Sequence, residues 1–256
     1  MLYRPLFWTS MWAEDWLFTA PQKPYSGAKT ILISSASAKT AFCFAYLVQK
    51  RGYPGVKVIG LTSQGNCAFT KGLRLYDAVF TYDCVEASIG TPQGAWMYVD
   101  VAGNDSLNLR VRKALGSCVV RNISLGVTNL SPSVKSTFIR PMSGVTDASH
   151  RASSSSDTPV EFFFMPEWLS ERRRSLGALA ISEMQYTAWT ALMRDCMAWV
   201  KMERTWGPED VRREYGEVVR GRVGPEKGMV WSLWSEQHGL RWERELSRKE
   251  PLSGRL

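Results

Sequence analysis

The 256-residue chain is 45% hydrophobic and 22% charged, which excludes disordered and fibrous classes and allows a sizeable core. Its net charge of +8 lies partly in Arg172, Arg173 and Arg174 and in the stretch 212–255, without the aromatic-basic or Cys/His patterns of nucleic-acid binders. No apolar run reaches 18 residues, and the five scattered cysteines form no CxxC pair, so we expect a cytoplasmic protein with no membrane span, disulfide framework or zinc site.

The apolar N-terminal stretch, interrupted by Arg4, Glu14 and Asp15, predicts a segment over 1–26 that covers a sheet edge or packs on a partner. Short apolar runs then alternate with helical patterns. Strands are predicted at 31–35, 56–62, 78–82, 96–101 and 118–125, and helices at 39–51, 65–74 and 105–115. This alternation indicates right-handed βαβ units and a parallel sheet.

Residues 127–160 are rich in Ser, Pro and Gly and predict a long loop. A sixth strand is expected at 161–164, followed by helices at 167–175, 178–204 and 208–220 and a last strand at 228–233. The predicted fold class is therefore α/β, a Rossmann-type doubly wound parallel sheet with a helical C-terminal extension. The predicted division is 1–26 (covering segment), 27–165 (nucleotide-binding domain) and 166–256 (helical region).

The turn after the first predicted strand carries mainly small residues. A dinucleotide site needs such residues, because the backbone must approach the diphosphate and the next helix offers free N–H groups at its start. The turn lacks the GxGxxG fingerprint, so a tight strand–helix turn without a ligand is the alternative. The candidate binding residues here are Ser35, Ala36, Ser37, Lys39 and Thr40.

The end of the second predicted strand reads Thr62-Ser63-Gln64-Gly65-Asn66 and contains no acid. NAD-binding domains usually place an acidic residue there for the ribose hydroxyls, whereas an acid would repel a 2′-phosphate. Thr62, Ser63 and Asn66 therefore favour NADP(H), and an ordinary polar turn is the alternative.

The fourth and fifth predicted strands end near glycines that let a backbone approach a nicotinamide ring. The candidates are Ala102, Gly103, Ser124 and Gly126, although both glycines also suit simple turns. Asp100 is interpreted as a possible cap of the following turn. With only two histidines, the sequence offers no assignable catalytic residue.

Together these segments resemble the cofactor domain of the medium-chain dehydrogenase/reductase superfamily, nearest its zinc-free quinone-reductase-like branch. The chain is most similar to an uncharacterised microbial family within it, recorded as a domain of unknown function. The resemblance covers roughly residues 2 to 233. It is carried by YRPLF (3–7) with Thr9 and Ser10, ISSASAKTAF (33–42), GLTS (60–63), GL (72–73) with LYD (75–77), YD (82–83), VDVAGN (99–104) and EFFF (161–164).

The resemblance implies an NADP(H) cofactor, with Ser63 and Tyr82 beside the adenosine phosphate. It also implies reduction of an enone, quinone or related carbonyl substrate. Two features depart from it: relatives carry an N-terminal GroES-like β domain before the point where this chain starts, and Gly65 stands where quinone-reductase relatives carry a basic residue.

Three functions follow from the sequence. The first is an NADP(H)-dependent oxidoreductase acting on a small-molecule substrate, with no nucleic-acid or membrane partner. The second is a catalytically degenerate Rossmann protein that binds nucleotide or a protein partner, in which Trp-rich ends favour a homodimer. The third, and least favoured, is a basic surface that binds acidic partners.

Overall fold

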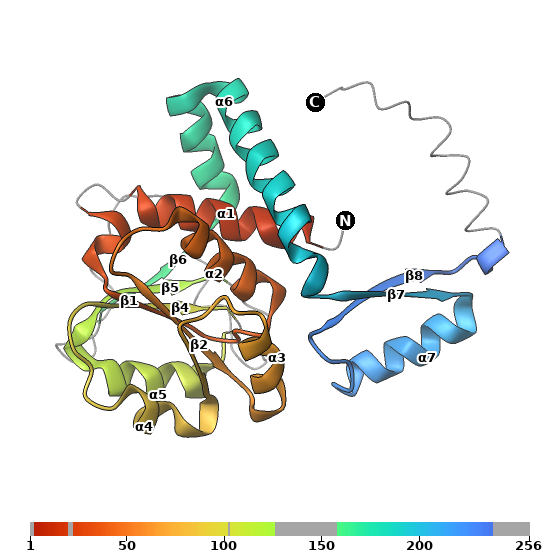
Figure 1. Ribbon diagram of the computed structural model, residues 1–256, viewed down its shortest axis with the longest axis horizontal. Coiled ribbons are helices and arrows are strands. Elements are labelled where there is room, and N and C mark those ends of the chain that lie inside the picture. Colours follow the sequence, from red (N-terminus) through yellow and green to blue (C-terminus); the bar gives the residue numbers. More distant parts are fainter. Residues whose placement is uncertain (1–2, 20–22, 102, 126–157, 238–256) are drawn as a thin grey trace. The chain divides into compact units, whose positions relative to one another are not determined.

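Six parallel strands form the central sheet in the order β3-β2-β1-β4-β5-β6 (Figure 1). The strands are β1 (Thr30–Ile33), β2 (Lys57–Thr62), β3 (Ala78–Thr81), β4 (Trp96–Asp100), β5 (Val119–Ser124) and β6 (Val160–Phe162). The computed structural model describes residues 3–19, 23–101, 103–125 and 158–237. Within it the chain divides into two units, Met1–Arg174 and Ser175–Leu256, and each is described by itself.

Helices cover both faces of this sheet, with α1 and α2 on one face and α4 and α5 on the other (Figure 1). Their bounds are α1 (Arg4–Phe18), α2 (Lys39–Arg51), α3 (Cys67–Gly72), α4 (Val85–Ile89) and α5 (Asp105–Leu115). The predicted doubly wound parallel sheet is confirmed, and α2 ends where Gly52 adopts the left-handed φ of +64°.

The core against α4 and α5 is built from alternate strand residues and from one stripe of each helix, as period-2 and period-3.6 patterns require. Its fully or nearly fully buried members are Leu32, Leu61, Val85, Ile89, Trp96, Tyr98, Leu107, Val111, Leu115 and Val119. This close packing holds the strands in place, and with them the carboxyl-terminal strand ends described in the next subsection.

Helix α1 is joined to the sheet unit by two buried carboxylates. Glu14 accepts two hydrogen bonds from Arg51 on α2, at 3.0 and 2.6 Å, and a third from the Tyr25 hydroxyl at 2.5 Å. Asp15 pairs with Arg172 at 2.8 Å. These contacts make α1 an integral layer of the first unit.

The long helix α6 (Met165–Asp195) loses helical geometry at Gly177, where φ is +82°, which matches the gap between the two helices predicted on either side. In the second unit it is followed by β7 (Lys201–Trp206), α7 (Pro208–Val219) and β8 (Lys227–Ser232). Strands β7 and β8 pair in parallel, so the C-terminal region contains a βαβ unit besides its helices.

The predicted helix at 178–204 is therefore wrong in its last residues. Lys201, Met202, Glu203 and Arg204 favour helices by intrinsic propensity, yet they form the start of β7. The 3₁₀ turn Cys196–Ala198 ends the helical path, and backbone pairing with β8 outweighs the local preference. In the part of the chain that the structure describes, no helix is long and apolar enough to cross a membrane.

Candidate nucleotide-binding site

The strand order of the sheet reverses between β1 and β4, which are neighbours although β2 and β3 lie between them in sequence. In open parallel sheets, ligands bind outside the carboxyl ends of the strands at such a reversal. The predicted binding segments follow β1, β2, β3, β4 and β5. Because all these strands are parallel, the segments start at the same edge of the sheet.

The β1–α2 turn is held tightly by its own backbone. The Ala36 N–H donates to the Leu61 carbonyl at 2.8 Å, and the Ala38 N–H donates to the Ser35 carbonyl at 2.7 Å. Ser35 adopts the left-handed φ of +50°, a conformation in which glycine is favoured and another residue is strained. Ala38 provides no side-chain cap for α2, and a helix that starts in this way is a common binding place for an anion.

Two polar contacts connect this turn to the ends of β2 and β3. Asn66 donates its side-chain amide to the Ser37 Oγ at 3.0 Å. The hydroxyls of Ser35 and Tyr82 lie 3.2 Å apart. Burial raises the pKa of Tyr82, so its hydroxyl stays protonated at neutral pH. Ser35, Ser37, Asn66 and Tyr82 thus form one polar cluster at the sheet edge.

Thr62, the last residue of β2, contributes a hydroxyl with no partner. Its residue is fully buried, and its Oγ1 makes no hydrogen bond to any residue that the structure describes. Buried hydroxyls are normally satisfied, so this atom is notable beside the turn. Ser63 follows it and accepts the Asn66 N–H on its carbonyl at 3.1 Å.

Asp100 organises the opposite side of the reversal. Its carboxylate accepts from the Ser34 hydroxyl at 2.7 Å, from the Asn108 amide at 2.7 Å and from the Gly103 N–H at 3.2 Å. The Val101 N–H in turn donates to Ser34 Oγ at 2.9 Å. Asp100 therefore caps the turn after β4, in agreement with its interpretation from the sequence.

The structure places the other candidates as follows. Lys39 and Thr40 lie in the first turn of α2, and Ser124 ends β5 in register with Asp100. Ala102 and Gly126 lie outside the described residues. The sequence patterns do not reveal Asn108 and Tyr76, because hydrogen bonds across 8 residues to Asp100 and across 40 residues to Ala36 follow no helix or strand period.

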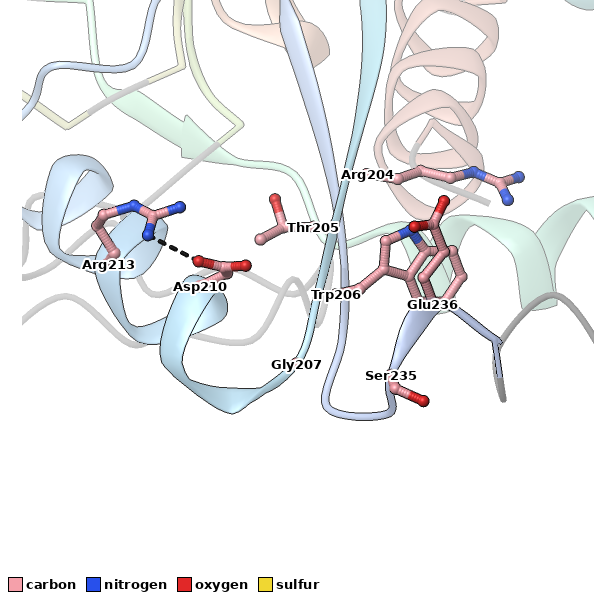
Figure 2. A pocket seen from close by; sticks show the side chains of 8 residues that line it. All are labelled: Arg204, Thr205, Trp206, Gly207, Asp210, Arg213, Ser235 and Glu236. Carbon is pink, nitrogen blue, oxygen red and sulfur yellow. Dashed lines mark ion pairs between the residues drawn. The ribbon is translucent and has the colours of Figure 1, made fainter.

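The second unit has a cavity of about 520 Å³ that none of the predicted binding residues line. Figure 2 shows Asp210 and Arg213 of α7 directed toward each other across one side, and their ion pair measures 2.7 Å. Trp206 and Glu236 border the other side. The charged side chains that line the cavity are two of each sign, because Arg204 and Glu236 line it together with this pair.

The family model described as "Protein of unknown function (DUF2855)" matches residues 1–224. The chain belongs to this family. No functionally curated protein shows significant similarity to it. The predicted membership in an uncharacterised family, recorded as a domain of unknown function, is thus confirmed.

Three of the solved structures to which this DUF2855 member is similar illustrate the match. CurA from Vibrio vulnificus, solved with NADPH, is 14% identical with a TM-score of 0.51, over 88% of this chain and 61% of CurA. A putative NADPH:quinone reductase from Bacillus thuringiensis is 16% identical with a TM-score of 0.49, over 82% and 58%. The YhdH oxidoreductase from Salmonella enterica, solved with NADP, is 14% identical with a TM-score of 0.48, over 88% and 60%. The chain spans about 60% of these proteins, and the likeness to CurA shows the fold.

Proposed function

We propose that this protein is an NADP(H)-dependent, zinc-independent oxidoreductase of the medium-chain reductase type. Its substrate class is an enone, a quinone or a related carbonyl compound. The observation that supports it most is the β1–α2 turn of small residues, which leads into an uncapped helix at the strand-order reversal. CurA, whose fold this chain shares, was solved in complex with NADPH, which supports the same cofactor here.

In this proposal each strand end has a separate task. The Ser37 and Lys39 region binds the diphosphate, and Ser63, Asn66 and Tyr82 contact the adenosine 2′-phosphate. The turn held by Asp100 borders the nicotinamide, which supplies the hydride when the cofactor is bound. The protein groups orient the cofactor, and no proton donor is assigned.

The second candidate function is nucleotide binding without turnover. It needs only the β1–α2 turn and helix α2, which begins without a side-chain cap, and no group for substrate chemistry. Under either function we propose a cytoplasmic protein without nucleic-acid or membrane partners, for which self-association into a homodimer stays a prediction.

The deciding experiment is a titration of the purified protein into NADPH, in which the fluorescence of the reduced nicotinamide reports binding. We expect saturable binding, and then oxidation of NADPH on addition of a member of an enone and quinone panel. Saturable binding with no turnover on any panel member would support the second function. An unchanged NADPH spectrum would contradict both forms of nucleotide binding.

A carboxylate at the end of β2 should change the cofactor preference. In Ser63→Asp we expect NADPH to bind roughly tenfold or more weakly, because the new charge repels the 2′-phosphate, while NADH keeps most of its affinity. The ratio of the two dissociation constants measures this effect. Ser63→Asn is the neutral control, and an equal loss for NADPH and NADH in Ser63→Asp would remove Ser63 from the 2′-phosphate site.

A further inference from the structure

Tyr76 reaches the phosphate-binding turn from the loop before β3. The next residue, Asp77, fixes this loop on β2, because its carboxylate accepts the Val58 N–H at 2.7 Å and its own N–H donates to the Val58 carbonyl at 2.8 Å. Gly60 on β2 has no side chain, so the Tyr76 ring can lie in the space beside it. A Cβ at this position would lie 2.8 Å from the Ala36 Cβ and 3.0 Å from the Tyr76 ring.

Through this space Tyr76 donates a hydrogen bond of 2.8 Å from its hydroxyl to the Ala36 carbonyl. Burial raises the pKa of Tyr76 well above its usual value, so the hydroxyl keeps its proton and acts as the donor. The Ala36 N–H is held as well, by the Leu61 carbonyl. Both polar backbone groups of Ala36 are therefore fixed from the β2 side.

The planar peptide bond carries this constraint to Ser37. The described chain has no cis peptide, and in a trans peptide the N–H points opposite to the preceding carbonyl. With the Ala36 carbonyl directed at Tyr76, the Ser37 N–H points away from Tyr76. This amide makes no hydrogen bond to any residue within the described ranges.

We infer that Tyr76 is a positioning residue for the cofactor diphosphate, because its hydroxyl holds the Ala36–Ser37 peptide with the Ser37 amide directed at the ligand. This inference rests on the proposed function. It assigns Tyr76 no contact with the cofactor itself. A purely structural Tyr76 would affect stability without affecting the dissociation constant for the nucleotide.

The test compares wild type, Tyr76→Phe and Tyr25→Phe in titrations with NADPH and NADH. Tyr76→Phe keeps the ring and removes only the hydroxyl, so we expect both dissociation constants to rise by the same factor, roughly 3- to 10-fold. Equal factors are expected because both cofactors carry the diphosphate. Tyr25→Phe also removes a buried hydroxyl hydrogen bond, to Glu14, and should leave both constants unchanged despite lower stability.

Hydrogen exchange, measured without any ligand, tests the role of Tyr76 independently of the proposed function. Hydrogen exchange of the Ala36 amide should be faster in Tyr76→Phe than in wild type and unchanged in Tyr25→Phe. If wild type binds NADPH and Tyr76→Phe binds it equally well, the positioning role is wrong and the proposed function stands. If wild type binds neither cofactor, the proposed function fails and this inference fails with it.

If Tyr76→Phe does not fold, Gly60→Ala serves as the second variant. Its new methyl group meets both Ala36 and the Tyr76 ring, so it should displace the same peptide and weaken NADPH and NADH by a common factor. Unchanged affinity in Gly60→Ala would also overturn the inference.

Discussion

Glu14→Ala is expected to lower the unfolding free energy of the first unit by about 3 kcal/mol. The variant removes the acceptor of three hydrogen bonds and leaves the Tyr25 hydroxyl buried without a partner. The Arg51 side chain, 35% exposed, also loses the carboxylate that raises its pKa, and only part of that charge regains water. Urea denaturation of wild type and variant measures the loss.

Glu86→Ala provides a matched control, because Glu86 and Arg110 form the same two-bond geometry on the surface. Their side chains are 52% and 40% exposed, and water replaces the lost contacts, so the variant should change stability far less than Glu14→Ala. Hydrogen bonding from Arg110 lowers the pKa of Glu86 from 4.5 to about 2. The benefit of this pair is present above pH 4.5 and disappears as the pH falls toward 2. An equal loss of unfolding free energy in the two variants would show that the burial of Glu14 does not strengthen its contribution to stability.

Ser37→Asp is expected to weaken NADPH binding at least about a hundredfold. A carboxylate about 5 Å from a diphosphate charge is repelled by about 3 kcal/mol at an effective dielectric constant of about 20. The Ser37 hydroxyl is the group that Asn66 contacts, so the new charge would sit inside the polar cluster. Isothermal titration of NADPH gives the dissociation constants.

Ser37→Asn has nearly the shape of Asp without its charge and should bind NADPH within a few-fold of wild type. A rise in salt should recover part of the affinity of Ser37→Asp, because screening weakens charge repulsion. If Ser37→Asp and Ser37→Asn bind equally well, the diphosphate does not lie at the β1–α2 turn.

The sheet was predictable because each of its strands is a short apolar run bounded by turn residues, as in 31–35 before the serine-rich turn. The short helix α4, Val85–Ile89, was missed because Gly90, Pro92 and Gly94 directly after it mark the stretch before β4 as a loop. Strand β7 was missed because its residues favour helices and only pairing with β8 makes them a strand.

The sequence allows the strand ends of the candidate site to be predicted, but not the side chains that support them. Small residues after β1 and the absence of an acid after β2 are visible in the sequence. The hydrogen bond from Tyr76 to Ala36 spans 40 residues, and the one from Arg51 to Glu14 spans 37. Such long-range hydrogen bonds depend on how helices and loops pack together, and the hydrophobic periodicity of the sequence contains no information about that packing.

The left-handed backbone conformation of Ser35 limits which amino acids this position can accept. Glycine and asparagine suit that geometry, whereas valine and isoleucine would clash with their own main chain. Glycine would relax the turn but would delete the oxygen that lies 3.2 Å from the Tyr82 hydroxyl. Serine at this position therefore keeps a hydroxyl beside Tyr82 even though its backbone conformation is strained.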